Sequence, residues 1–575
     1  MRKGFIQILK AGACIGLALS SVFASAQISA ISLIIVSRQT TPISGETVQD
    51  ALNAAIAAGQ PSYTLPPNPI DLTTSLMIPK GTKDFMLIGA NGTSLRRASA
   101  SDFPLLVIGD SASYALDNFY LNKYPQMNIL PVAEGATVLT RTGGANPVTG
   151  WYALVGTHAT DDVVRHSSGS PTFHFRRELI RVISVQGQNL TLAQGIGRDF
   201  LNPQLRLVQA DSATTKEVTE NITVRNVTLF GRSTVNNSLS NKILMCSLGH
   251  NISLDDVSVQ GFNTAGISFG FSKGIFINRA RVSDGNRQTL GYGIEIAGSR
   301  NVTIRNSTFS THRWGVIYQS GAMDALVEDC TFNNGSSSEG FDVGHGFDEK
   351  RLTYRRVIAP VFSIGNPSWR RGNSDTLLED CTATSAINFY GNTRNVTIRG
   401  RHPSQTYTTP LFNFFTEGGG SGIPAGVTYP ISVIVENGNS RRSVLDGVNT
   451  QMISMSSQAV RLGTFTARNW TFENNVTSTG AAIYFRATTV PTQITLENST
   501  VSNKYEWNGP IALGPVSGTG SWNLNIRNTK LLGMGPHSIV VQNGAPASVL
   551  QTNSTFKGLI LDSSSVSGAT VTRGN

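Results

Sequence analysis

Two carboxylates stand out as candidate catalytic groups because they occupy equivalent places in a repeated strand. In six short strands one residue lies between two apolar neighbours, and these middle residues are Ser268, Glu295, Ile317, Asp342, Ser363 and Asn388. Stacked strands lie about 4.8 Å apart, so Glu295 and Asp342 would be two strands, or roughly 10 Å, apart between their Cα atoms. Carboxyl groups about 6.5–9.5 Å apart leave room for the water of an inverting glycoside hydrolase. The spacing therefore predicts a hydrolytic pair, with one carboxyl of raised pKa as the acid and the other as the base. The alternative is two solvated strand carboxylates.

The segments beside these carboxylates are rich in groups that bind sugars and anions. His345 lies between two glycines, where the backbone leaves room for a ligand, and it is the third candidate catalytic residue beside Glu295 and Asp342. Arginine binds carboxylate or sulfate through two parallel hydrogen bonds, and aromatic faces suit sugar rings. The alternatives are a turn role for His345 and a solubility role for the arginines. The expected substrate-binding residues are His312, Arg313, Trp314, Lys350, Arg355, Arg356, Trp369 and Arg370.

Metal and cofactor chemistry has weaker support. Asp348 and Glu349 could bind calcium, but no Asp-x-Asp-x-Asp loop accompanies them. The chain has four cysteines, and neither a CxxC motif nor a Cys/His cluster with zinc spacing occurs. We predict that no cofactor is required, and calcium is the one alternative.

A short sequence motif recurs through the middle of the chain at intervals of 20–30 residues. The strands that it forms must position the candidate catalytic and binding residues. Each copy is a strand of alternating character that is opened by a turn former and followed by a second apolar strand. Such spacing, with no helical period between the copies, is typical of a coil of strands. The copies begin at Asn221, Asn251, Gly274, Asn301, Asp324, Arg351, Asp375 and Asn395.

We therefore predict an all-β fold, a right-handed single-stranded parallel β-helix. The sixth residue after each repeat start should point inward, provided that the chain bends just before it. In two repeats this residue is a cysteine, Cys330 and Cys381, and the two would lie two turns, or roughly 10 Å, apart. A disulfide needs Cα atoms within about 7 Å, so both should be free, buried thiols. The inward column reads Val227, Val257, Ala280, Ser307, Cys330, Val357 and Cys381.

The ends and two interruptions differ from the repeats. Apolar residues in Thr47–Ala58, followed by Gly59, predict a short amphipathic helix that caps the N-terminal end of the coil. Residues 135–210 predict a small antiparallel β insertion with a turn at Gly187-Gln188. The predicted divisions are a signal peptide (1–26), a linker (27–44), the cap and first turns (45–134), the antiparallel insertion (135–210), central turns with the active site (211–402), an irregular insertion (403–457) and C-terminal turns (458–575).

The repeats resemble the pectate-lyase-like β-helix superfamily, which includes polysaccharide lyases, polygalacturonase-type hydrolases and tailspike-like proteins. The cap helix, followed by Tyr63-Thr-Leu65 and Phe85-Met-Leu-Ile-Gly89, is similar to the start of those proteins. The resemblance spans most of residues 45–570 and implies the architecture. Of the four polygalacturonase motifs only Gly344-His345-Gly346 is present, and the Trp-x-x-Asp-His signature of many pectate lyases is absent. No catalytic set can be transferred, because a shared fold does not determine the chemistry.

Residues 1–26 have the pattern of a secretory signal, with cations at the start, an apolar run and Ala24-Ser25-Ala26 before the cleavage point. We expect a secreted protein, extracellular or periplasmic, with no membrane contact after cleavage. An uncleaved anchor is the alternative. The signal carries three cations and no acid, so its removal lowers the formal charge from +10 to +7. The cations form no dense run, and nucleic acid is not expected as a partner.

Three functions remain open. The favoured one is an enzyme that hydrolyses glycosidic bonds of a polysaccharide, expected to be acidic, through Glu295 and Asp342. The second is a polysaccharide lyase or a polymer uronate epimerase, in which His345 or Lys350 removes a proton and Arg313 neutralises the uronate. The third is a non-catalytic carbohydrate-binding surface or adhesion β-helix.

Overall fold

The computed structural model describes residues 43–574 with internal gaps, and the expected signal peptide lies outside them. The described part of the chain contains no helix with the length and hydropathy of a membrane span. The gaps are 110–122, 157–162, 165–172, 175, 287, 289, 334–339, 345–347, 366–372, 391–392, 402–411, 416–430, 443–452, 456–460, 476–480, 486–487, 489, 504–508, 515, 517–518, 534–537, 542–546 and 556–568.

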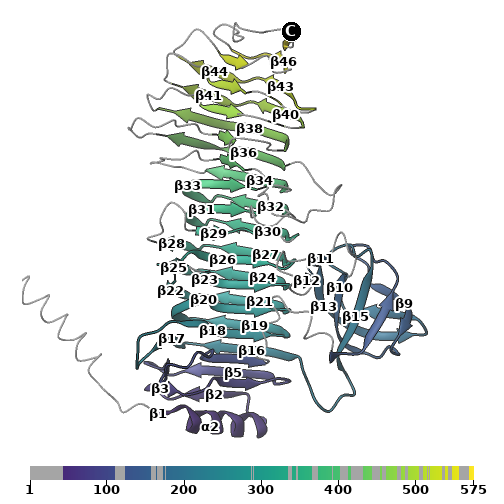
Figure 1. Ribbon diagram of the computed structural model, residues 1–575, viewed down its shortest axis with the longest axis vertical. Coiled ribbons are helices and arrows are strands. Elements are labelled where there is room, and N and C mark those ends of the chain that lie inside the picture. Colours follow the sequence, from purple (N-terminus) through teal and green to yellow (C-terminus); the bar gives the residue numbers. More distant parts are fainter. Residues whose placement is uncertain are drawn as a thin grey trace, which may run out of the picture.

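The chain winds into a parallel β-helix of about 14 stacked coils, which confirms the predicted fold class (Figure 1). The strands form three parallel ladders along the coil. The first ladder contains β2 (Ser62–Leu65), β5 (Lys83–Gly89), β16 (Thr219–Arg225), β19 (Gly249–Asp255), β21 (Lys273–Asn278), β24 (Arg300–Arg305), β27 (Met323–Glu328), β30 (Lys350–Arg355), β32 (Ser374–Glu379), β34 (Arg394–Arg401), β36 (Ile431–Arg442), β38 (Leu462–Asn474), β40 (Pro491–Glu497), β43 (Ser521–Arg527), β46 (Ala547–Thr552) and β47 (Ala569–Gly574).

The second and third ladders follow the first around each coil. Three strands turn the corner between these two ladders and take part in both: β20 (Ser258–Gly270), β31 (Ile358–Ile364) and β33 (Thr382–Phe389). The second ladder also contains β1 (Ile43–Ser44), β3 (Pro69–Leu72), β6 (Ser94–Arg97), β17 (Thr228–Ser233), β22 (Arg281–Gly285), β25 (Thr308–Ser310) and β28 (Thr331–Asn333), and, stacked with the end of β38, β41 (Thr500–Asn503) and β44 (Lys530–Gly533). The third ladder contains β4 (Leu76–Pro79), β7 (Leu106–Gly109), β18 (Ser240–Ser247), β20 (Ser258–Gly270), β23 (Tyr292–Ala297), β26 (Trp314–Gln319), β29 (Gly340–Asp342), β31 (Ile358–Ile364), β33 (Thr382–Phe389), β35 (Phe412–Phe414), β37 (Ile453–Met455), β39 (Ile483–Phe485), β42 (Ile511–Leu513) and β45 (Ile539–Val541).

The repeated turn formers are structural, as their position predicts. Asn221, Asn251 and Asn301 have φ between 55° and 59°, a region that asparagine and aspartate tolerate better than most residues. Their side chains also stack, since Asn251 Nδ2 donates to Asn221 Oδ1 at 3.0 Å. A second left-handed residue precedes each member of the predicted inward column, for example Asp329 (φ 53°) before Cys330. This is the bend that the inward column requires.

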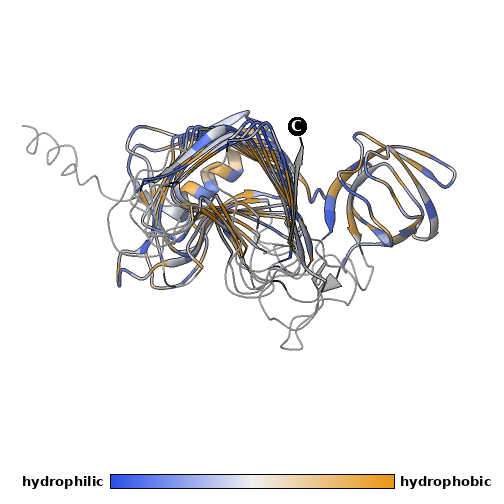
Figure 2. Cartoon of the chain, turned by 90° about the horizontal axis from the view of Figure 1, so that it is seen from above, coloured by the Kyte–Doolittle hydropathy of each residue, from blue (hydrophilic) through white to orange (hydrophobic). Residues whose placement is uncertain are grey.

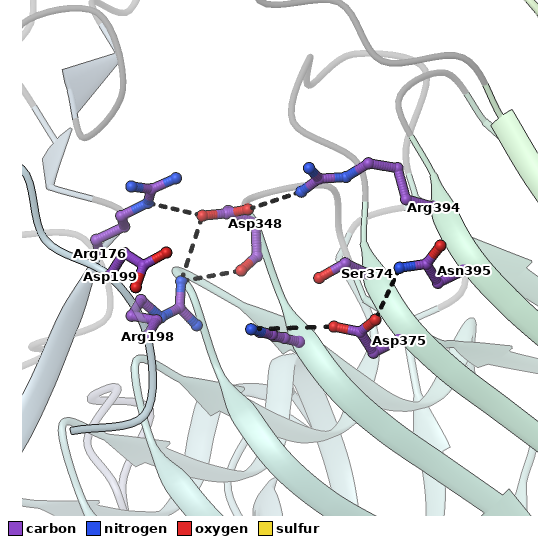
Figure 3. Close-up of a pocket in the computed structure, with 9 residues that line it drawn as sticks. Arg176, Arg198, Asp199, Asp348, Ser374, Asp375, Arg394 and Asn395 are labelled. Atoms are coloured by element: carbon purple, nitrogen blue, oxygen red, sulfur yellow. Dashed lines mark hydrogen bonds and ion pairs between the residues drawn. The ribbon is translucent and has the colours of Figure 1, made fainter. Parts of the chain in front are cut away.

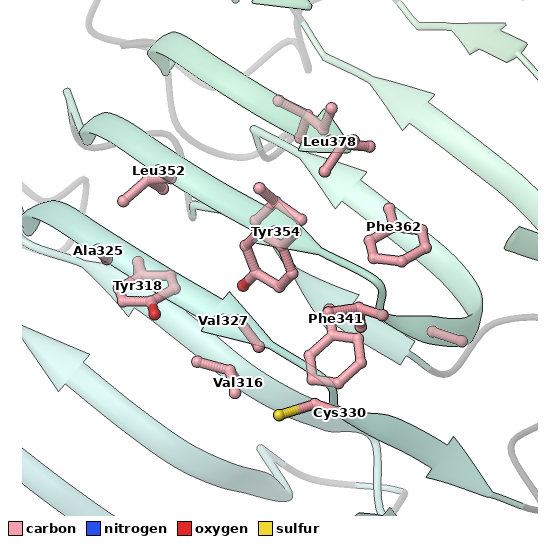
Figure 4. Close-up of a cluster of buried hydrophobic side chains, with 14 of the residues drawn as sticks. Val316, Tyr318, Ala325, Val327, Cys330, Phe341, Leu352, Tyr354, Phe362 and Leu378 are labelled. Carbon is pink, nitrogen blue, oxygen red and sulfur yellow. The ribbon is translucent and has the colours of Figure 1, made fainter. Parts of the chain in front are cut away.

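One continuous hydrophobic core fills the coil from the cap helix to the C-terminal turns. In Figure 2 the coil is seen along its axis, with hydrophobic ribbon facing the interior. Figure 4 shows Cys330 packed among inward side chains from successive coils. Cys330 and Cys381 are buried free thiols, as predicted, and burial raises the pKa of each to about 12.

The N-terminal end of the coil is covered by α2 (Gly45–Ala57), which confirms the predicted cap helix. Val48, Leu52 and Ala55 are buried, and the helix lies across the end of the first coils (Figure 1). Gly59 follows the helix with φ of 66°, the left-handed conformation that ends many helices.

The antiparallel insertion closes into a small barrel beside the coil (Figure 1). The turn at Gly187-Gln188 is confirmed, because Gln186 pairs with Asn189 across it. The barrel begins earlier than residue 135, since a strand from Gln126 pairs with both its neighbours and completes the closure. Its strands are β8 (Gln126–Ile129), β9 (Val138–Gly144), β10 (Gly150–Gly156), β13 (Arg177–Gln186), β14 (Asn189–Leu192) and β15 (Pro203–Ala210), with β11 (Val163–Val164) and β12 (Phe173–His174) as a separate pair.

The barrel is fixed to the coil by apolar and charged contacts. Trp151 and Leu179 of the barrel form a buried cluster with Leu248 and Phe271. The last two residues have φ of 54° and 51°, so they mark the left-handed corner after the third ladder. The buried Glu178 of the barrel also pairs with Arg300 of the coil. The insertion is therefore held against the corner that follows the third ladder.

Three strands of the coil, β35, β36 and β37, lie within residues 403–457, where we expected an irregular insertion. β35 pairs with β33 and β37, and β36 pairs with β34 and β38, all in parallel register. The expectation was wrong for these described strands. Because this segment is rich in Gly and Thr, its strands could not be recognised from the sequence. Their pairing depends on the neighbouring coils.

An ion-pair column runs along the end of the first ladder. From Arg305 onward the residues in register alternate in charge, and each carboxylate in that part has an arginine in register on either side. For example, Arg355 Nε lies 2.6 Å from Glu379 Oε2, and Arg399 Nη1 lies 3.5 Å from Glu379 Oε1. The column reads Arg225, Asp255, Asn278, Arg305, Glu328, Arg355, Glu379, Arg399, Glu436, Arg468, Glu497 and Arg527.

Reversing one charge in this column should destabilise the coil. Glu379→Lys would place three cations in register and should cost about 1–2 kcal/mol, since each cross-strand charge pair contributes roughly 0.2–1 kcal/mol. The thermal midpoint should fall, and the fall should shrink in 1 M salt because of screening. Glu379→Gln should have a smaller effect. Equal midpoints for the wild type and Glu379→Lys at low salt would contradict this account.

Candidate functional site

The strand register confirms that the residues of the predicted column stack in line along the third ladder. Ser268 pairs with Glu295, Glu295 with Ile317, and Ile317 with Asp342. The column continues through Ser363 to Asn388. Neighbouring residues, such as those shown in Figure 4, point to the core. Glu295 and Asp342 thus face the same way from coils two steps apart, at roughly 10 Å between Cα atoms.

Glu295 is held in a buried ion pair. It is 4% exposed. Its Oε2 accepts hydrogen bonds from Lys242 Nζ at 2.6 Å and Ser268 Oγ at 2.5 Å, and its Oε1 accepts one from Gln319 Nε2 at 2.6 Å. Burial alone would raise the pKa of Glu295, but the charge of Lys242 and these hydrogen bonds together hold it below its usual value. Glu295 is therefore ionised at neutral pH and suits a base or a charge stabiliser, not the acid of raised pKa.

Asp342 lies close to two tyrosines. It is 1% exposed. Burial raises the pKa of Tyr292, and the negative charge of Asp342 raises it further. Burial and the charge of Asp342 also raise the pKa of Tyr390, against a hydrogen bond with Ser363 that lowers it. Both phenols therefore stay protonated at neutral pH and can donate hydrogen bonds near Asp342.

Arg313 and Trp314 lie at the start of β26, beside this cluster. The Arg313 guanidinium is 5.9 Å from the centre of the Trp314 ring, a cation–π contact. Arg313 is exposed and Trp314 is half-buried. Trp314 pairs in register with Tyr292, next to the carboxylates. The structure brings these two predicted binding residues to the candidate site.

His312 does not take part in this surface. Its side chain is 0% exposed, and its ring lies 4.9 Å from that of Phe332 and 5.5 Å from that of Phe262. The preceding Thr311 has φ of 56°, which reverses the alternation and turns His312 inward. The prediction that His312 binds substrate was wrong.

Lys350 lies around the corner from Asp342, at a polar cavity of about 270 Å³ between the barrel and the coil (Figure 3). It forms an ion pair with Glu134 of the barrel and lies 4.0 Å from Asp375. Figure 3 shows Asp348 between arginines from both sides of this cavity. The cavity is lined by Arg176, Arg198, Asp199, Asp348, Lys350, Ser374, Asp375, Arg394 and Asn395.

The surroundings of Asp348 do not favour calcium. Arg176 Nε donates to its Oδ2 at 2.8 Å, and Arg198 and Arg394 approach to 3.5 and 3.7 Å. A calcium ion there would face three guanidinium groups. No group of three or more metal-ligating side chains occurs among the described residues.

Arg355 and Arg356 belong to the charged edge of the first ladder, not to a substrate surface. Arg355 bonds to Glu328 and Glu379, and Arg356 to Asp329 and Glu328. Their side chains serve the stacking of coils, so the structure does not support the predicted substrate role. His345, Trp369 and Arg370 lie outside the described residues.

Four residues of the site were not predicted: Lys242, Tyr292, Gln319 and Tyr390. Lys242 and Tyr292 stand three residues before the column member of their own coil. Gln319 and Tyr390 stand two residues after it, at the end of the third-ladder strands. The alternation of a strand would have placed Gln319 and Tyr390 on the face of the column, but it would have placed Lys242 and Tyr292 on the opposite face.

Solved structures similar to this chain include three phage tailspike proteins. The tailspike gp49 of Pseudomonas phage LKA1 matches with a TM-score of 0.50 and 15% identity, over 91% of this chain and 77% of the other. The tailspike gp61 of Pseudomonas phage phi297 gives 0.52 and 14%, over 88% and 73%. The Gp54 tailspike of Acinetobacter baumannii bacteriophage AP22, solved in complex with A. baumannii capsular saccharide, gives 0.53 and 13%, over 89% and 77%. At these identities the likeness is one of fold.

Comparison of the amino-acid sequence with family models and with curated proteins finds no match.

Removing the cation beside Glu295 should destabilise the fold in a pH-dependent way. The folded pKa of Glu295 is depressed, so its charge contributes stability above the unfolded pKa of about 4.3, and this is lost as pH falls through the folded pKa. Lys242→Met leaves a buried carboxylate without its partner and should cost about 3–5 kcal/mol at pH 7. The cost should shrink at pH 4, where Glu295 of the variant can bind a proton.

Urea unfolding at both pH values measures this effect. Lys242→Arg is the control, because it keeps the charge and should be milder. A Lys242→Met penalty of the same size at pH 7 and pH 4 would show that the ion pair is not its source.

Proposed function

We propose that this chain is an exported enzyme that binds a polysaccharide along the outer face of the third ladder and hydrolyses its glycosidic bonds. The observation that carries the proposal is the placement of Glu295 and Asp342 on one face, two coils apart in exact register. This spacing is compatible with a water molecule between a carboxylate and a sugar. The fold shared with tailspikes, one of them solved with a capsular saccharide, supports a polysaccharide partner.

The two carboxylates have different surroundings and therefore different proposed roles. Glu295, kept ionised by Lys242, activates the attacking water by accepting its proton. Asp342, which is buried, takes the role of the acid and in its protonated form donates a proton to the leaving sugar oxygen. Burial favours the neutral form of a carboxyl group, which suits an acid. Arg313 and Trp314 bind the sugar beside this pair.

Substituting either carboxylate should abolish most of the cleavage. Glu295→Gln and Asp342→Asn should each lower kcat by roughly 10²–10⁴-fold, the usual contribution of a general acid or base. The assay measures new reducing ends together with ultraviolet absorbance over a panel of polysaccharides. Glu379→Gln, on the first ladder, is the control and should cleave at the wild-type rate.

Two results would contradict this proposal. Full activity in folded Glu295→Gln and Asp342→Asn would remove both residues from the reaction. An unsaturated, ultraviolet-absorbing product would identify a lyase.

A binding function without cleavage is the second candidate. It is favoured by the hydrogen bonds to both oxygens of Glu295, which resemble a structural ion pair as much as a catalytic base. In that case the chain would bind a polysaccharide, and the cleavage assay would detect no new reducing ends.

A further inference from the structure

The outward column changes character on the C-terminal side of Asp342. The next three members are Ser363, Asn388 and Asn413, on β31, β33 and β35, and all are uncharged. Asn413 Nδ2 donates to Asn388 Oδ1 at 3.1 Å, so the two amides form a short ladder. Each amide offers both donors and acceptors, which suit sugar hydroxyls.

A stacked aromatic pair lies directly beside these amides. The rings of Tyr390 and Phe415 are 4.9 Å apart between centroids and 16° from parallel, and both residues are half-buried. They follow Phe389 and Phe414, which point into the core, so they continue the alternation outward. Tyr390 also forms a hydrogen bond with Ser363, and the charge of Asp342 raises the pKa of Tyr390. The aromatic pair therefore extends from the carboxylate site over the next coils.

Three of the cations that we expected to recognise an acidic substrate, Lys350, Arg355 and Arg356, are committed elsewhere, whereas Arg313 lies beside Trp314 at the start of β26. Lys350 pairs with Glu134, Arg355 belongs to the ion-pair column of the first ladder, and Arg356 pairs with Asp329 and with Glu328 of that column. Among the described members of the outward column from Asp342 to Asn413, none carries a positive charge. A carboxylate held over this column would lose water without gaining a cation, which is costly.

We infer that the surface formed by Ser363, Asn388, Asn413, Tyr390 and Phe415 is a subsite for uncharged sugar units. The amides bind the hydroxyl groups, and the rings pack against the apolar face of the sugar. This inference rests on the proposed binding of a polysaccharide along the third ladder. It replaces the expectation of an acidic substrate for the units that lie beyond Asp342.

Affinity electrophoresis tests the subsite separately from cleavage. Native gels contain galactomannan or pullulan, both neutral, or the same polymer after its primary hydroxyls have been oxidised to carboxylates. The wild type should be retarded by at least one neutral polymer and less by its oxidised form. Phe415→Ala should weaken that retardation about three- to tenfold, as expected for the loss of one aromatic contact. Phe415→Tyr should preserve it.

Phe276→Ala is the matched control, because Phe276 is 39% exposed on the first ladder. It should bind like the wild type, and thermal midpoints show whether each variant is folded. Stronger retardation by the oxidised polymer, wild-type binding by Phe415→Ala, or no retardation by either neutral polymer would overturn the inference. Retardation without new reducing ends would contradict the proposed hydrolysis but would still support the subsite.

Discussion

Every feature of this protein depends on the in-register stacking of one coil on the next. Parallel stacking continues only if each corner turns at the same place, and residues such as Asn301, Asn306 and Asp329 adopt φ near 50–60° to make those turns. Once the corners are aligned, residues at the same position of successive coils must stack into a column. The interior columns then form a single core, and each exterior column acquires a chemical character of its own.

The exterior columns divide the surface between stability and binding. The end of the first ladder carries alternating charges that bond to one another, so most of the arginines there hold coils together. The third ladder carries Glu295 and Asp342, followed by amides and stacked rings. The same geometric rule thus concentrates ionic bonds on one edge and leaves an uncharged strip beside the proposed catalytic pair.

The barrel joins these surfaces because it packs against the corner that follows the third ladder. Its Arg177 Nε would lie 2.2 Å from a Cβ atom at Gly298, so a larger residue at this corner would displace the arginine from its present position. Burial lowers the pKa of Arg177 to about 10, and the charge of Glu295 opposes that shift. The barrel therefore contributes to the electrostatic environment of Glu295 as well as to the cavity around Lys350.

The local sequence pattern predicts much of the fold of this protein. Turn formers at a regular interval, followed by alternating apolar residues, predict the parallel coil and the buried thiols Cys330 and Cys381. Apolar residues in Thr47–Ala58, followed by Gly59, predict the cap helix. The repeats also predict that Glu295 and Asp342 face the same way, because a column follows from the repeat alone. The pattern could also have revealed the charged edge, since the fifth residue of successive motifs alternates in sign.

Only the tertiary structure decided which polar groups meet and which are hidden. His312 turns inward because one left-handed residue reverses the alternation, and a single inverted φ leaves no clear mark in the amino-acid pattern. Lys242 meets Glu295 across 53 positions of the chain, and Glu134 of the barrel meets Lys350 across 216. Such partners depend on how coils and insertion pack, and packing, unlike periodicity, is set by contacts between residues far apart in the chain.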